Sequence, residues 1–195
     1  GLKRPEITPT YSAMQEVVTG QVPVMFSASS ELEIRRAISL QKEKGFKLVL
    51  TGMEDYENVI DEIKASGAGV LVKLEIPDDK AIKAQKEDAS DEVKVLNARV
   101  KEAYESALAQ ASKLEAAGIP FAFSTVGVKS GDIMKALQKM ISNGLSEKAA
   151  LAALTTNPAA ILGLSNVAGS IAKGKMANLI LSTDSLFSED SQIKH

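Results

Sequence analysis

The sequence predicts an α/β fold built on a parallel sheet, and two observations carry this prediction. Four short segments each begin with a glycine, continue as an apolar run and lead into a stretch with helical periodicity. Nearly every residue within each run is apolar, without the alternation expected of a sheet that faces water on one side. Strands of this kind are covered by helices on both faces, as in consecutive βα units.

The four expected strands are separated by segments long enough to contain a helical crossover. They run from Gly20 to Phe26, Gly45 to Leu50, Gly67 to Leu74 and Gly118 to Phe123. Each opening glycine stands where a preceding helix should end, because a left-handed glycine is a common helix C-cap. Four such strands make half of an eight-stranded barrel or a small doubly wound sheet, and the periodicity does not choose between the two.

Helical periodicity fills the intervals between the apolar runs. The expected helices are 31–44, 56–66, 79–117 and 132–143. Ser30 is the expected N-cap of the first helix, whose apolar stripe includes Ile34 and Ile38. The early part of the region 79–117 is polar enough to predict a mobile excursion.

The last quarter of the chain departs from this repeating plan. We expect an alanine-rich helix at 145–154, a further helical turn opened by Asn157-Pro158, a turn-rich stretch at 163–174 and a strand at 178–181. That strand would lie outside the βα units.

Composition excludes several classes of function. The 195-residue chain has 23 basic and 25 acidic residues mixed along its length. Because the basic residues are not clustered, we expect no nucleic-acid partner. No apolar run approaches the length of about 20 residues that a membrane helix needs, so no membrane partner is expected. The absence of cysteine excludes disulfides, thiolate metal sites and cysteine nucleophiles. The single histidine, His195, is the last residue and is expected to be a tail residue.

The most specific motifs of the chain lie in its last quarter. They are Gly144-Leu145-Ser146, Thr155-Thr156-Asn157-Pro158-Ala159, Ile161-Leu162-Gly163-Leu164, Gly169-Ser170-Ile171, Gly174-Lys175 and Ala177-Asn178-Leu179-Ile180. In this order they closely resemble the C-terminal region of imidazolonepropionase-like members of the amidohydrolase superfamily. Asn178 stands where that family usually has an aspartate. The resemblance extends back over nearly the whole chain.

The resemblance implies that the four apolar runs are strands five to eight of a (β/α)8 TIM-type barrel. Residues 1–163 are then the barrel segment, and 164–195 are part of the small β-sandwich that both chain ends build in this family. The first half of the barrel, with its His-x-His strand, is absent. We therefore expect the chain to be a segment of a longer protein.

The resemblance also locates the family's metal ligands, which project from the carboxyl ends of the strands. Amidohydrolases activate water on one or two divalent metals. The matching positions here hold Ser27, Thr51 and Val126. A neutral hydroxyl is a poor substitute for imidazole, and valine has no donor atom. We therefore expect no metal or other cofactor in this segment, and a zinc-type divalent metal only in a full parent protein.

Polar residues at the same strand ends are candidates for binding rather than catalysis. Ser27, Thr51, Lys73 and Thr125 would surround the mouth of the barrel. No histidine is available to activate a serine there as a nucleophile. We therefore predict no catalytic residue.

The sequence leaves three functions open. The leading hypothesis is a catalytically degenerate amidohydrolase-like segment with a scaffolding or domain-packing role. One alternative is a part of a metal-dependent hydrolase acting on non-peptide C–N bonds, with its metal site in the missing half or in a second domain. The other alternative is a small-molecule binding module at the barrel mouth.

The expected partner is another part of a barrel. Four parallel strands leave two open edges and an uncovered apolar face, both of which favour association. The partner would be the rest of a longer parent chain or a second copy in a homo-oligomer. The sequence leaves the cellular compartment open, including export of the parent protein.

Overall fold

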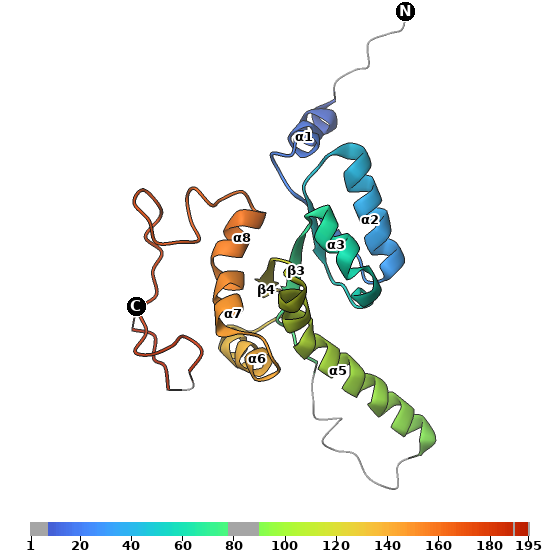
Figure 1. Ribbon diagram of the computed structural model, residues 1–195, viewed down its shortest axis with the longest axis vertical. Coiled ribbons are helices and arrows are strands. Elements are labelled where there is room, and N and C mark those ends of the chain that lie inside the picture. The colour runs from blue at the N-terminus through green and yellow to red at the C-terminus, as the bar shows by residue number, and fades with distance from the viewer. Residues whose placement is uncertain (1–7, 78–89, 189, 195) are drawn as a thin grey trace, which may run out of the picture.

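The computed structural model describes residues 8–77, 90–188 and 190–194. Its centre is one sheet of four parallel strands in the order β1-β2-β3-β4, with helices packed around it (Figure 1). The strands are β1 Val24–Ser27, β2 Leu48–Thr51, β3 Gly69–Lys73 and β4 Phe121–Ser124. The four predicted strands and their parallel arrangement are confirmed.

Seven α-helices and one 3-10 helix surround the sheet within the described residues. They are α1 Pro9–Val18, α2 Glu31–Lys44, η1 Glu57–Val59, α3 Ile60–Ser66, α5 Asp91–Ala117, α6 Ser130–Ser142, α7 Glu147–Leu154 and α8 Thr156–Ile161. The sequence pattern did not predict α1, whose N-cap is Thr8. Helix α5 begins at Asp91, and residues 79–89 of the predicted helical region 79–117 lie outside the described residues.

Glycines end the helices where the sequence predicted them. Gly45, Gly67 and Gly118 follow α2, α3 and α5 with φ values of 77°, 66° and 70°. A residue with a Cβ atom is strained in this left-handed conformation, whereas glycine is not. Each glycine thus stops a helix and turns the chain into the next strand.

One face of the sheet forms the core with the helices. Its strand residues are Leu48, Leu50, Val70, Val72 and Phe121, all almost fully buried. They pack in a cluster with Ile34 and Ile38 of α2, Ile63 of α3 and Leu114 of α5. Full burial of each such side chain stabilises the fold by roughly 1.5–3 kcal/mol.

The opposite face of the sheet is only partly covered. Val49 and Ala122 are buried on it, and Ile161 of α8 lies against the Cα of Gly69 at its amino-terminal side. Met25 of β1 keeps 55% of its surface exposed. We call the remaining part the open face; it comprises Met25, Ser27, Thr51, Leu71 and Ser124, whose side chains alternate in direction with those of the core.

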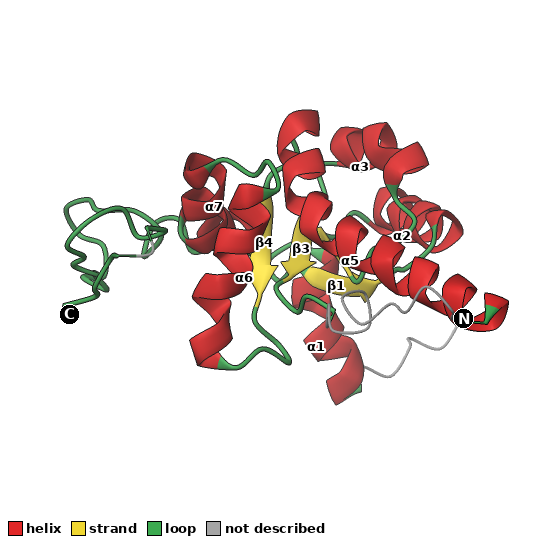
Figure 2. Cartoon of the chain, turned by 90° about the horizontal axis from the view of Figure 1, so that it is seen from below, coloured by secondary structure: helices red, strands yellow, loops and turns green. Residues whose placement is uncertain are grey.

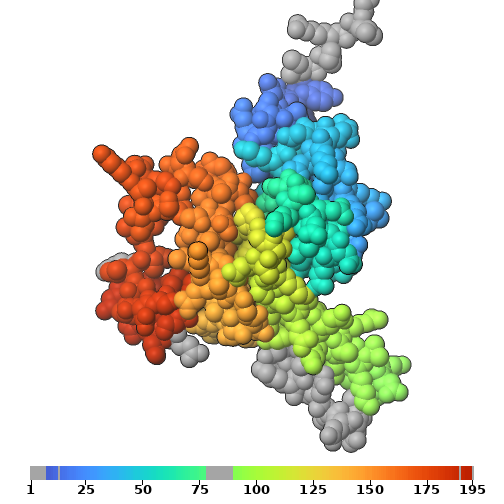
Figure 3. All heavy atoms as spheres, viewed as in Figure 1, coloured from blue at the N-terminus to red at the C-terminus, as the bar shows by residue number. Residues whose placement is uncertain are grey.

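The C-terminal segment forms a lobe beside α6 and α7 (Figure 3). Phe187 attaches it, because its side chain is buried and its carbonyl accepts a hydrogen bond from Gln138 of α6. The predicted strand at 178–181 is wrong, since the structure assigns none there. Only the antiparallel bridge between Ser182 and Ile193 forms, so the preceding apolar residues lack a neighbouring strand and stay exposed. None of the helices in the described ranges is both long enough and apolar enough to cross a bilayer.

Gly69 offers a test of how α8 packs on the sheet. A Cβ atom at this position would lie 3.1 Å from two side-chain carbons of Ile161. We expect Gly69→Ala to lower the free energy of unfolding by about 1–3 kcal/mol, because overpacking forces α8 to move. Urea unfolding would measure the change.

Gly131 of α6 provides the matched control, because nothing lies within 4 Å of a Cβ added there. Gly131→Ala should raise the unfolding free energy by roughly 0.5–1 kcal/mol. Equal stability of the Gly69→Ala variant and the unsubstituted chain would contradict the packing of Ile161 on the sheet.

Candidate functional site

The carboxyl ends of the four strands meet at one edge of the sheet, and Ser27 and Thr51 lie next to each other there. They are the last residues of β1 and β2 and are paired in the sheet register. The Ser27 Oγ lies 3.2 Å from the position that a Cβ would take on Gly52. The hydroxyl of Ser27 therefore points toward the loop that follows β2.

Lys73 and Thr125 lie at the ends of the other two strands. Lys73 ends β3 and is paired with Ser124, the last residue of β4, and Thr125 follows directly. Val126, the next residue, is 82% exposed. The structure thus places all four predicted mouth residues at the same end of the sheet, with only Ser27 and Thr51 as direct neighbours among them.

The residues at these strand ends do not fit a divalent metal. Ser27 and Thr51 offer neutral hydroxyls, and Val126 offers a hydrocarbon. Catalytic zinc is held by imidazole, carboxylate or thiolate donors. Across residues 8–77, 90–188 and 190–194, no three His, Cys, Asp or Glu side chains are grouped so that they could hold an ion. No chemical step through a metal can be derived from this set of donors.

Glu33 of α2 shapes the loop that follows Ser27. Its Oε2 accepts hydrogen bonds from the Ser29 N–H at 2.8 Å, the Ser29 hydroxyl at 3.0 Å and the Ser30 N–H at 3.3 Å. Ser30 is the N-cap of α2, as predicted. These bonds, above all the one from the Ser29 N–H, lower the pKa of Glu33 below its ordinary value of 4.5. The serine cluster therefore has a structural role as a helix start.

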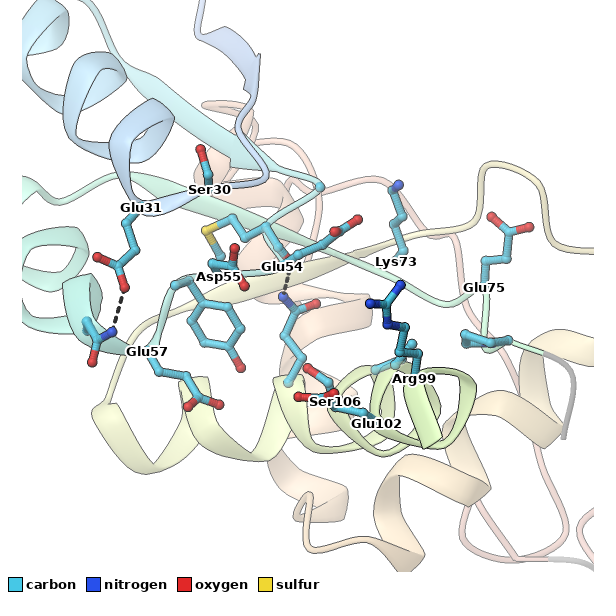
Figure 4. Close-up of a pocket in the computed structure, with 18 of the residues that line it drawn as sticks. Ser30, Glu31, Glu54, Asp55, Glu57, Lys73, Glu75, Arg99, Glu102 and Ser106 are labelled. Carbon is cyan, nitrogen blue, oxygen red and sulfur yellow. Dashed lines mark hydrogen bonds between the residues drawn. The ribbon is translucent and has the colours of Figure 1, made fainter. Parts of the chain in front are cut away.

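A pocket of about 1160 Å³ lies beside the strand ends, between the loop after β2, the end of β3 and α5. Figure 4 shows Glu54 and Asp55 opposite Glu102 and Ser106 of α5, with Lys73 and Glu75 toward one end and Glu31 and Glu57 toward the other. Lys73 is the only predicted mouth residue that lines the pocket. Ser27, Thr51 and Thr125 lie outside it.

Side-chain contacts fix the α5 wall of this pocket. Gln110 donates from Nε2 to the Met53 carbonyl at 2.8 Å, and Lys113 forms an ion pair with Glu57. Sequence reasoning missed these residues because the helical period of α5 marks packing but does not tell which polar side chain reaches a distant loop. The separation of more than fifty residues leaves no local signal.

Tyr56 lies in the wall of the pocket with its ring in the core. The residue is 1% exposed, and its hydroxyl has no hydrogen-bond partner in the described part of the chain. Burial, with a smaller contribution from Glu57, raises the pKa of Tyr56 to about 12. The phenol therefore stays neutral at physiological pH and is a poor proton acceptor or donor for catalysis.

Comparison with known proteins shows which family and which solved structures this chain resembles. The family model described as "Amidohydrolase family" matches residues 5–192. Among curated proteins no match is found. The strands and helices also superpose on solved structures, each below 25% identity, which shows a shared fold.

Three solved structures illustrate the likeness. An amidohydrolase from Thermotoga maritima MSB8 has a TM-score of 0.72 and 21% identity, covering 98% of this chain and 45% of its own. Molinate hydrolase has a TM-score of 0.63 and 16% identity, covering 90% and 40%. The ochratoxinase of A. niger has a TM-score of 0.62 and 18% identity, covering 93% and 41%. The chain thus spans less than half of each, and its sheet corresponds to part of a TIM-type barrel.

Glu33 predicts a pH dependence of stability. Its folded-state pKa is lowered, so its contribution is present above pH 4.5 and is lost as the pH falls through the folded pKa. We expect urea midpoints to fall between pH 7 and pH 3 by less in Glu33→Gln than in the unsubstituted chain. Glu92→Gln, at the exposed start of α5, is the control and should fall as the unsubstituted chain does. An equal fall in Glu33→Gln would contradict this assignment.

Proposed function

Because this chain belongs to the amidohydrolase family, we propose that it acts as a catalytically silent half of a barrel of that family. Its role is structural: it presents four βα units against which other barrel units pack. The single observation that carries this proposal is the set of side chains at the strand ends, because Ser27, Thr51 and Val126 stand there at the positions where the family resemblance would place metal ligands.

The local geometry supports a lost site over a rearranged one. Ser27 and Thr51 remain paired neighbours at the carboxyl ends of β1 and β2, so the scaffold of the site persists while its donors have changed. A hydroxyl on each strand cannot replace two imidazoles as a zinc ligand at neutral pH. Among the last-quarter motifs that carry the resemblance, Gly144 to Ser146 leads into α7 and Thr155 to Ala159 opens α8, and both helices pack against β4 rather than supply chemistry.

Hydrolysis by a longer protein is the alternative that the family kinship favours. In that case this chain would supply strands and surface, and a zinc-type metal site acting on C–N bonds would lie in the remaining barrel units or in a second domain. Such a protein would lose its hydrolase activity on treatment with a chelator. Retention of full activity in the chelator would exclude this alternative.

Small-molecule binding is a further alternative, and the pocket beside α5 favours it. Its walls carry both carboxylates and the cations Lys73 and Arg99. A ligand that binds only the folded state raises the unfolding temperature by mass action. A screen of small charged compounds that produces no thermal shift, or shifts that persist in Lys73→Ala, would exclude binding at this pocket.

Metal content tests the proposal on the unsubstituted chain. We expect zinc, manganese and iron each to be far below one ion per chain after purification, since the strand ends lack suitable donors. Elemental analysis measures this content. One tightly held ion per chain that is lost in the variant Ser27→Ala/Thr51→Ala would sink the proposal.

Restoring the donors provides the complementary prediction. The variant Ser27→His/Thr51→His/Val126→Asp should bind zinc at least about tenfold more tightly than the unsubstituted chain, the size of effect that a ligand's supporting contacts commonly have. Competition with a chromophoric chelator gives the affinity.

A matched control places the same residue types at exposed positions away from the strand ends. The control variant is Ser142→His/Ser165→His/Val95→Asp. Circular dichroism of both variants verifies that they fold. Equal zinc affinity of the two variants would show that Ser27, Thr51 and Val126 do not mark a former metal site.

A further inference from the structure

In the described part of the chain no further strand pairs with β1 or β4, so each of these outer strands has one free edge whose hydrogen-bonding groups can be assigned. In a parallel sheet, alternate residues direct both N–H and C=O toward the same neighbour. The Leu74 N–H donates to the Ser124 carbonyl at 3.0 Å, so Ser124 and Ala122 face β3. Phe121 and Phe123 therefore direct their main-chain groups to the free edge of β4.

Asn157 already occupies one group on this edge. Its Nδ2 donates to the Phe121 carbonyl at 2.8 Å from the first turn of α8. Phe123 has no hydrogen bond to a loop or a side chain among the described residues. The β4 edge thus has a free N–H and a free C=O at Phe123, whereas the Phe121 carbonyl already accepts a hydrogen bond from Asn157.

The free edge of β1 lacks one hydrogen-bond donor. The Val24 N–H donates to the Lys47 carbonyl at 2.8 Å, so Val24 faces β2. Pro23, Met25 and Ser27 therefore face outward. Pro23 has no N–H, so this edge lacks a donor at one position, just as the β4 edge lacks a free acceptor at one position.

We propose that the free edge of β4 pairs in parallel with the β1 edge of a second copy of this chain, in a register that Asn157 sets. Phe123 then lies opposite Val24 of the second copy. The Phe123 N–H donates to the Pro23 carbonyl of the second copy, and its Met25 N–H donates to the Phe123 carbonyl. The Phe121 carbonyl, which already accepts from Asn157, then faces the Pro23 nitrogen, which has no hydrogen to donate, so neither group loses a hydrogen bond in this register.

The register inside the sheet supports the same pairing independently. Phe26, Leu50, Val70 and Phe121 lie level across the four strands. With Phe123 opposite Val24 of the second copy, Phe121 lies opposite its Val22, which is four residues away from its Phe26. Two identical halves therefore accumulate a stagger of about eight residues, the shear of a (β/α)8 barrel. Pairing Phe123 with Phe26 instead would give about half that stagger and would not close such a barrel.

A two-fold axis along the barrel makes both junctions identical. The edges β1 and β4 lie on opposite sides of the sheet, so both free edges of both copies are paired at once (Figure 2). The second copy also covers the open face, including the exposed Met25.

The chain spans 45% of the Thermotoga maritima structure, so two copies supply about one barrel. This inference rests on the proposed role as half of a barrel, and it identifies the other half as a second copy of the same chain.

The absence of cysteine allows the register to be tested by cross-linking. In the expected register Ser124 lies beside Met25 of the second copy. Within one chain these residues are separated by three strand spacings across the sheet, roughly 14 Å, and are also displaced by four residues along the strands. The variant Met25→Cys/Ser124→Cys should form a covalent dimer on mild oxidation. The variant Ser27→Cys/Ser124→Cys, shifted by two residues, should do so at least about tenfold less.

Asn157→Asp tests the register role, because aspartate has the same size but no donor. It should lower cross-linking through Met25→Cys/Ser124→Cys by about tenfold, the loss expected for one buried hydrogen bond. Asn178→Asp, an exposed substitution of the same kind, is the control and should leave cross-linking unchanged. Equal cross-linking through the two cysteine pairs, or no effect of Asn157→Asp, would overturn the register role.

Sedimentation of the cysteine-free chain gives the assembly without any substitution. We expect a species of twice the 20.7 kDa chain mass. A monomer at the highest concentration attainable, or oligomers that grow without limit, would overturn pairing with a second copy. Neither result touches the metal measurements, so this inference and the proposed function fail separately.

Discussion

Main-chain hydrogen bonding across parallel strands is the constraint on which the rest of this structure depends. Each strand can pair on both sides, and within the described residues the outer strands β1 and β4 have a neighbouring strand on one side only. The same bonding holds Ser27 and Thr51 side by side at the carboxyl end of the sheet. It therefore underlies both the proposed loss of a metal site and the proposed pairing with a second copy.

Much of this arrangement could be predicted from the sequence because its signals are local. Continuous apolar runs marked the strands, and Gly45, Gly67 and Gly118 marked the helix ends. The prediction of a strand at 178–181 was wrong because a strand forms only where another strand can pair with it. An apolar run does not reveal whether such a strand is available. Helix α1 was missed because it precedes the first apolar run and so lies outside the repeating βα pattern by which the other helices were assigned.

The positions of the predicted site residues in the fold followed from the sequence, whereas their surroundings did not. Ser27, Thr51, Lys73 and Thr125 all lie at one end of the sheet because parallel strands align their carboxyl ends. The pocket on α5 was not foreseen, since it depends on contacts such as that between Gln110 and the Met53 carbonyl. Asn157 is the instructive case: its motif identified the family, but only the structure places its amide on the edge of β4.

The proposed loss of metal-binding donors and the proposed structural role as half of a barrel are consistent with each other. Ser27 and Thr51 lie side by side at the strand ends, where they offer only hydroxyl groups, and Val126 offers only a hydrocarbon side chain. Crystals grown with excess zinc and measured at the zinc absorption edge test this account most directly. It predicts no anomalous peak within coordination distance of Ser27, Thr51 or Val126. A strong peak coordinated by those strand ends would contradict it.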